Sequence, residues 1–141
     1  GVKRGEALVE VASAAPALFT VSGGRGQALA ANEDGSRNSS SNPAAPGSIV
    51  ILYATGDGAV HPSLVEGLPA REPFPAPALP VKVTAGGLAA EVLYAGPAPG
   101  MVGVFQLNVR LPAGYVPSGA LPVVLHLGPF QSQAGVTITL K

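Results

Sequence analysis

The sequence predicts an all-β domain, and three features of its 141 residues support this. Fifteen prolines and nineteen glycines interrupt the chain every few residues, which leaves little room for a helix of about ten residues or more. Several of the segments between them alternate apolar and polar side chains with the period of a β-strand. The length suits one hydrophobic core, so a single compact domain is expected.

The turn residues divide the chain into successive strands. In "FQLNVRL", the apolar side chains from Phe105 to Leu111 alternate with polar ones, so this strand has one buried and one wet face. The stretch "SIVILYAT" is instead continuously apolar, which predicts a central strand covered on both faces. "TAGG" supplies a tight turn. Strands are expected at residues 7–12, 17–21, 27–32, 48–55, 80–84, 89–94, 102–111, 121–127 and 135–140.

Two long segments, 32–47 and 56–80, are predicted to be excursions from the sheet. The first is polar. The second contains "HPSLVEGLPAREPFPAPALP", and its many prolines favour an extended, polyproline-like backbone. We expect it to lie along the surface as a strap that is anchored by Leu64, Leu68 and Phe74.

The charge content is low and balanced. Charged residues make up 11% of the chain and the formal net charge is zero, whereas roughly 25% is usual for soluble domains. Either Ala, Gly and Pro raise the apolar count without forming patches, or large faces are buried against neighbours. The balanced charge excludes an electrostatic surface for nucleic acid and removes long-range repulsion between copies. The sequence also has no apolar run of about 18 residues that could span a bilayer.

No residue pattern indicates a catalytic or metal site, so no enzyme activity, cofactor or metal is expected. The chain has no cysteine, and its two histidines, His61 and His126, are not at a ligand spacing. His126 lies in a predicted strand, opposite Val123 and Leu125. In "TGDGAVH", Asp57 offers one carboxylate where calcium binds about six to eight oxygens, so this stretch is interpreted as a turn. The carboxylates are scattered, whereas a glycosidase needs two in one cleft.

Asn38 is a candidate for modification. Asn38-Ser39-Ser40 matches the N-glycosylation sequon and lies in a polar segment, so Asn38 could carry a glycan on an exported protein. The alternative is a Ser/Asn-rich loop without a glycan. The first residue is Gly and not Met, which is consistent with removal of a secretion signal and equally with a fragment.

Three stretches together resemble a known family: "GSIVILYATGDGAV", "VKVTAGGLAAEVLYAGPAPGMVGVFQLNVRLPAG" and "LPVVLHLGPFQSQAGVTITL". The chain resembles the acidobacterial, Solibacter-type C-terminal domain family of uncharacterised function. The resemblance extends over nearly the whole chain and rests on Gly56-x-Gly58, the turn from Tyr94 to Gly100 and "QLNVRLP". It implies an Ig-like antiparallel β-sandwich of about seven to nine strands with long proline-rich loops, in an extracellular or cell-surface setting. It implies no activity and no catalytic residues.

The first predicted strand has no partner near it in the sequence, because small residues and Pro16 follow it instead of a hairpin turn. This segment can pair with its own sheet, fray, or join the sheet of another copy by β-strand addition. In longer relatives the corresponding segment links an upstream domain to this one, so here we expect it to link one copy to the next. The candidate self-assembly residues are Ala7, Leu8, Val9, Glu10, Val11 and Ala12.

The sequence therefore predicts an N-terminal strand and linker at residues 1–20 and a sandwich at residues 21–141. The leading hypothesis is a non-enzymatic subunit of an extracellular bacterial filament, which polymerises by inserting its first strand into the next copy. Such a contact joins two different surfaces and propagates unless it closes into a ring. The expected partner is another copy, with surface glycans as further candidates. The alternative is an appended Ig-like module for surface attachment, sorting, or ligand or carbohydrate binding.

Overall fold

The computed structural model describes residues 1–114 and 118–141. These residues form β-strands and no helix, which confirms the all-β prediction, and accordingly no helix among them could cross a membrane. The strands are β1 (Ala17–Leu18), β2 (Thr20–Ser22), β3 (Arg25–Ala28), β4 (Ala30–Asn32), β5 (Ile49–Thr55), β6 (Val60–His61), β7 (Ala76–Pro77), β8 (Val81–Ala85), β9 (Leu88–Pro97), β10 (Phe105–Arg110), β11 (Gly119–Leu127), β12 (Phe130–Gln131) and β13 (Val136–Leu140).

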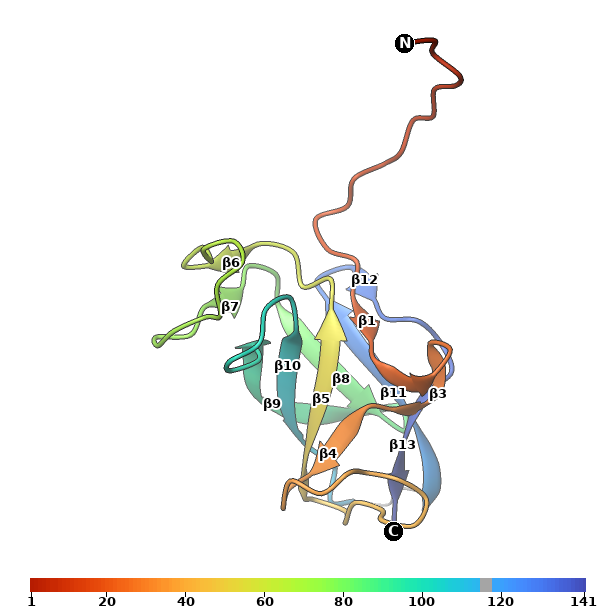
Figure 1. Ribbon diagram of the computed structural model, residues 1–141. Coiled ribbons are helices and arrows are strands. Elements are labelled where there is room, and N and C mark those ends of the chain that lie inside the picture. The colour runs from red at the N-terminus through yellow and green to blue at the C-terminus, as the bar shows by residue number, and fades with distance from the viewer. Residues whose placement is uncertain (115–117) are drawn as a thin grey trace.

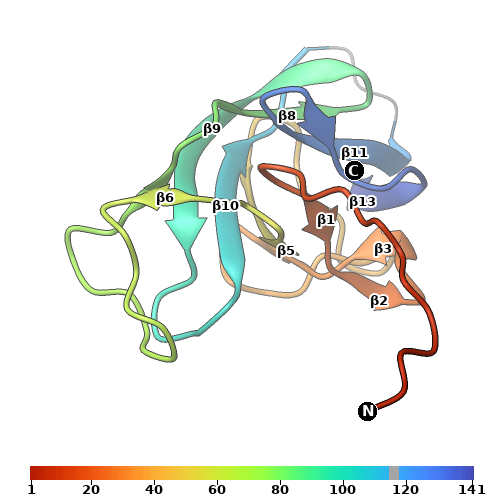
Figure 2. The same ribbon diagram turned by 90° about the horizontal axis from the view of Figure 1, so that it is seen from above.

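The main sheet runs in the order β1-β5-β10-β9-β8-β11-β13-β3-β2, and its pairs are antiparallel except for β13 with β3. One edge of β5 pairs with β10, and the other pairs with β1 and β4 in succession. Strands β3 and β4 follow each other in the chain but pair near opposite ends of this order: β3 pairs with β13, and β4 pairs with β5. The strands therefore wrap around one core, an arrangement consistent with a β-sandwich (Figures 1 and 2).

Alternate side chains of the strands form the core, as the periodicity predicts. In β10, Phe105, Leu107 and Val109 are at most 1% exposed, while the polar residues between them are half-buried. Pairing with β5 and β9 on its two edges makes β10 central in the sheet. The prediction that His126 lies opposite Val123 and Leu125 is also confirmed, since both of these are buried and His126 is half-buried.

The prediction that β5 is covered on both faces is wrong for its outer face. Val50, Leu52 and Ala54 are fully buried, whereas Ile51 and Tyr53 remain partly exposed. Directly opposed residues share a face of the sheet, and across β10 these two are opposed by Asn108 and Gln106. A continuous apolar run can therefore come from a strand that is buried on one face only, with polar side chains of the next strand beside it on the other face.

The expected strand count of seven to nine is not confirmed. The predicted strands at residues 17–21 and 27–32 are each divided, at Phe19 and at Leu29, because the chain changes partner there. Phe19 donates its N–H to the carbonyl of Tyr53 and accepts the N–H of Leu29. In addition, β6, β7 and β12 have only two residues each, too few for a periodicity to appear in the sequence.

Candidate interaction surface at the N-terminal end

Residues 1–12, here called the arm, extend away from the body (Figure 1). All of them are exposed and none belongs to a strand. Leu8, Val9 and Val11 are 102%, 81% and 96% exposed. Lys3 and Glu6 form an exposed ion pair within the arm, with Nζ and Oε2 2.6 Å apart. In the described residues, the predicted strand at 7–12 thus has no partner in its own sheet.

The root of the arm crosses the end of β5 beside two glycines. Ala15 donates its N–H to the carbonyl of Gly56 over 2.9 Å. Gly56 and Gly58 have φ of 78° and 73°, and a Cβ on either would collide with the carbonyl oxygen of Ala15 or Ser13. Only glycine permits this backbone and this approach. The Gly-x-Gly motif therefore holds the segment from which the arm departs.

The body begins earlier than residue 21, where the sequence placed its boundary. Ala14, Pro16 and Leu18 are buried. The side chain of Gln133 pairs with the free edge of β1: its Nε2 donates to the carbonyl of Leu18 over 2.7 Å, and its Oε1 accepts the Leu18 N–H over 3.0 Å. One side-chain amide thus takes the place of a neighbouring strand, and residues 14–20 belong to the body.

The segment at residues 56–80, here called the strap, connects β5 to β8 and contains the β6–β7 pair. Phe74 anchors it by packing edge-on against Tyr94, with ring centroids 6.3 Å apart. The carbonyl oxygen of Pro75 would lie 2.8 Å from a Cβ on Gly96, so the strap passes close over β9. The prediction that Leu64 and Leu68 also anchor the strap is wrong, because these side chains are exposed. The strap is held at its proline-rich second half.

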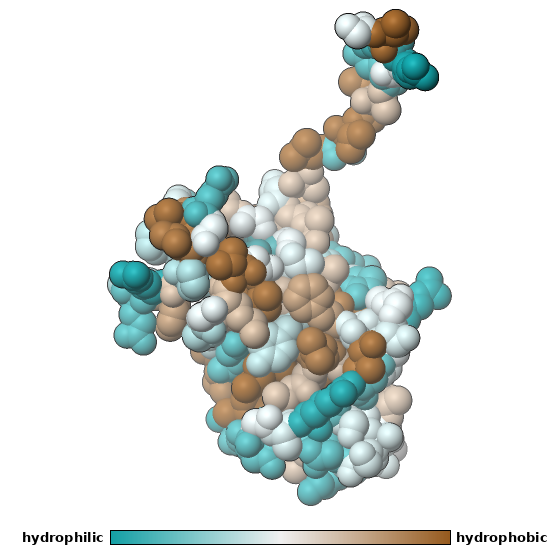
Figure 3. Space-filling view, viewed as in Figure 1, coloured by the Kyte–Doolittle hydropathy of each residue, from teal (hydrophilic) through white to brown (hydrophobic). Residues whose placement is uncertain are grey.

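A groove lies between the strap and the loop that joins β9 to β10. It consists of two hollows of about 230 and 360 Å³ that share Leu64, Val65 and Leu68. Here it is called the apolar groove, and the large apolar side chains on it are between 44% and 68% exposed: Leu64, Val65, Leu68, Met101 and Val102. Figure 3 shows apolar side chains gathered over the strap and along the stem of the arm. Met101 and Val102 were not predicted to lie at a site, although an apolar pair inside the turn "PGMVG" is a signal of an exposed patch.

Asp57 gives the apolar groove a carboxylate. It lies between the two glycines of the arm root and lines the groove together with Glu66. Burial raises the pKa of the Asp57 carboxyl, because desolvation disfavours its charged form. Among the described residues, Asp57 forms no ion pair. The second hollow also has Arg71 in its lining, so the groove combines apolar walls with charged groups of both signs.

Asn38, the candidate glycosylation site, is 0% exposed. Its Nδ2 donates to Asn32 Oδ1 and to the carbonyl of Thr139, each over 2.9 Å. Its Oδ1 accepts from Gln27 Nε2 over 2.9 Å and from the Thr139 N–H over 2.8 Å. A glycan on Nδ2 would break this network and open the core. The structure therefore argues against a glycan at this candidate sequon and favours the alternative of a loop without one, in which Asn38 joins the loop to β13.

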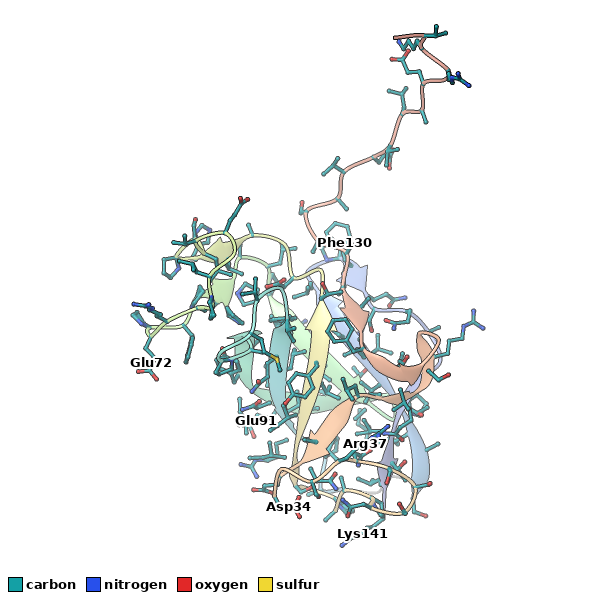
Figure 4. All side chains as sticks on the ribbon, viewed as in Figure 1. Asp34, Arg37, Glu72, Glu91, Phe130 and Lys141 are labelled. Atoms are coloured by element: carbon teal, nitrogen blue, oxygen red, sulfur yellow. The ribbon has the colours of Figure 1, made fainter. Side chains whose placement is uncertain are left out.

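The opposite end of the body is polar. Figure 4 places Phe130 near the end from which the arm leaves, and Asp34 and Lys141 at the other end. A hollow of about 200 Å³ there is lined by Asp34, Glu33, Lys141 and neighbouring small or polar residues. Asp34 already accepts hydrogen bonds from the N–H and the hydroxyl of Ser36, which lower the pKa of its carboxyl. The two ends thus differ in chemistry, one apolar and one polar.

The remaining candidate side chains are dispersed. His61 lies exposed on β6 of the separate β6–β7 pair, and His126 lies on β11 of the main sheet. Glu91 pairs with Arg110 on the surface, with Oε2 and Nε 3.3 Å apart. Across residues 1–114 and 118–141, no three His, Asp or Glu side chains gather in a way that could hold a metal ion.

No family model, curated protein or solved structure matches this chain. The resemblance to the acidobacterial family therefore stays a prediction. The arrangement of the arm and the apolar groove is consequently the ground on which a function can be argued.

Proposed function

We propose that the protein is a non-enzymatic structural subunit that assembles with copies of itself by donating its arm to a neighbour. The observation that carries this proposal is the exposure of Leu8, Val9 and Val11 on an arm without a partner in the described residues. Burying such a side chain is favourable by about 1.5 to 3 kcal/mol. An arm that stays in water forgoes this gain, whereas an arm that docks on another copy obtains it.

Strand addition is the proposed mode of docking. The N–H and C=O groups of residues 7–12 are available for ladder hydrogen bonds of about 1 kcal/mol net each. Val9 and Val11 share one face of an extended segment, so alternate side chains would set the register. Association costs about 4 to 15 kcal/mol, which makes one arm marginal and calls for lateral contacts. The exposed Val21 and Leu29 on the body are candidates for these, and zero net charge permits close approach.

The proposed assembly is an extracellular bacterial filament of Ig-like antiparallel β-sandwiches. A donated arm and the surface that accepts it are different, so the contact is heterologous and propagates when each arm goes to a further copy. The setting outside the cell and the Ig-like topology rest on the resemblance described above. The absence of cysteine is compatible with this setting but does not argue for it.

A second candidate function is an appended Ig-like module that serves surface attachment, sorting, or ligand or carbohydrate binding. The observation that favours it is the apolar groove, a concave site with apolar walls and the acidic groups Asp57 and Glu66. In this case the arm would be a linker, and the chain would remain monomeric.

Deletion of residues 1–12 tests the leading proposal. The intact chain should form filaments in electron micrographs and large species in sedimentation, and the shortened chain should sediment as a monomer. Deletion of residues 1–6 is the matched control, because it keeps Ala7 to Ala12 and should preserve assembly. Since the arm makes no contact with the body, the melting temperature of the monomer should not change. Filaments of normal length from the chain that begins at residue 13 would exclude the proposal, and a monomeric intact chain would favour the module.

A further inference from the structure

We infer that the apolar groove is the surface that accepts the arm of a second copy. This inference rests on the proposed function, since it presupposes that the arm is donated, and it goes further by naming the acceptor. The groove arises only where the strap meets the loop between β9 and β10.

The chemistry of the arm matches that of the groove. Among the described residues outside the arm, nine large apolar side chains are exposed, and five of them lie on this groove. The arm offers Leu8, Val9 and Val11 to such a surface. Within residues 7–12 the one charge is Glu10, and the lining of the groove includes Arg71 as well as Asp57 and Glu66.

Other surfaces of the body fit the arm less well. The core is closed without the arm, because its side chains are at most a few per cent exposed. No missing strand therefore leaves a gap inside the described sheet, so strand addition would take place at an edge. The short strands β6 and β7 border the apolar groove, since Pro62 follows β6 and Pro75 precedes β7 in its lining. The hollow at the opposite end is lined mainly by polar and charged groups, and Asp34 in it is already bonded to Ser36. Apolar side chains would gain little there.

The occupant is the arm of a second copy and not the chain's own arm. The root is held by the hydrogen bond between Ala15 and Gly56, and Pro16 restricts Ala15 to extended backbone. From this root, residues 1–12 lead away from the body and not along the groove beside it (Figure 1). Extended outward, the twelve residues reach roughly 40 Å, enough to meet another molecule.

The position of the groove constrains the assembly. Asp57 lies on the groove and also between the glycines of the arm root, so donor and acceptor share one end of the body. Two copies joined in this way meet with these ends together. If each returns its arm to the copy from which it receives one, the result is a closed dimer; if each passes its arm to a further copy, the result is an open chain.

A mixing experiment tests the inference. The donor-only variant carries Leu68→Glu and Val102→Glu, which place charges on the groove at exposed positions and should leave folding intact. The acceptor-only variant lacks residues 1–12. Each should be monomeric alone, and an equimolar mixture should give a one-to-one complex and nothing larger by light scattering. Leu88→Glu with Leu93→Glu is the control, since both side chains are 44% exposed on β9 and away from the groove; this variant should assemble normally.

The possible results separate the two proposals. We expect the groove substitutions to weaken assembly at least about 100-fold, because they remove apolar contacts and introduce charges that docking of the apolar arm would have to strip of water. If the groove variant assembles as the intact chain does, while arm deletion still abolishes assembly, the groove inference is wrong and the proposed function stands. If arm deletion has no effect, both are wrong. An intact chain that stops at a closed dimer sensitive to the groove substitutions would support the groove and overturn the filament.

Discussion

Replacing Asn38 with alanine should destabilise the protein strongly, although the residue lies in a loop. The substitution removes four side-chain hydrogen bonds, which join Asn38 to Asn32, to Gln27 and to both backbone groups of Thr139. At a net contribution of about 0.5 to 1.5 kcal/mol each, their loss lowers the free energy of unfolding by about 4 kcal/mol. For a domain of this size, such a loss corresponds to a fall of roughly 10 to 15 °C in melting temperature.

Ser40→Ala is the matched control for this substitution. It removes the glycosylation sequon as completely as Asn38→Ala does, but Ser40 is exposed and its side chain takes no part in the network. The expected change is within about 0.5 kcal/mol. Asn38→Asp provides a second test, since it keeps both acceptor positions, loses the two donated bonds and buries a charge; it should destabilise at least as much as alanine.

Thermal and urea denaturation of the three variants measure these differences. A melting temperature of Asn38→Ala within about 3 °C of that of the unaltered chain would contradict the buried hydrogen-bond network, because its loss should cost far more stability. Expression in a host that glycosylates exported proteins gives a second check: loss of the mass of a glycan in Ser40→Ala would contradict the burial of Asn38.

Gly56→Ala should lower the free energy of unfolding by about 2 to 4 kcal/mol, because the alanine would need a positive φ and its Cβ would collide with the root of the arm. Gly23→Ala is the control: its φ of 64° is also positive but the space around it is open, so the expected loss is only about 1 to 2 kcal/mol. Equal losses in denaturation would contradict the close approach at Gly56. Gln133→Ala leaves both backbone groups of Leu18 without their partner and should make the Leu18 amide exchange hydrogen faster, so unchanged exchange would argue against the pairing. Burial raises the folded-state pKa of Asp57, so ionisation of this carboxyl opposes folding. Asp57→Asn should therefore raise the melting temperature at pH 7, and this gain should disappear below about pH 4, where the carboxyl is protonated in both states. A gain in melting temperature that does not depend on pH would exclude this cause.

Local periodicity was sufficient to predict most of the strands. The alternation from Phe105 to Leu111 follows directly from one dry and one wet face, and the structure has that pattern in β10. Glycine and proline marked the turns for a similarly local reason, since they restrict or widen the backbone angles of single residues. These features needed no knowledge of distant contacts.

The same kind of reasoning failed where burial depends on a remote segment. Asn38 belongs to a sequon in a polar stretch, yet it is buried by contact with Thr139, 101 residues further along the chain. Leu64 and Leu68 are apolar and were expected to anchor the strap, but the contact of Phe74 with Tyr94 holds it instead and leaves them on a groove. Hydrophobicity indicates that a side chain benefits from burial, and it does not say which neighbour provides it.

By itself, the sequence determined the all-β class, the dry faces of the main strands and the apolar alternation of the arm. Only the tertiary structure decided that the core closes without the arm, that Gly56 and Gly58 hold its root, and that an apolar groove lies beside that root. The physical reason is that the period of a segment records which of its faces avoids water, whereas the partner that covers the face is brought there by the path of the whole chain.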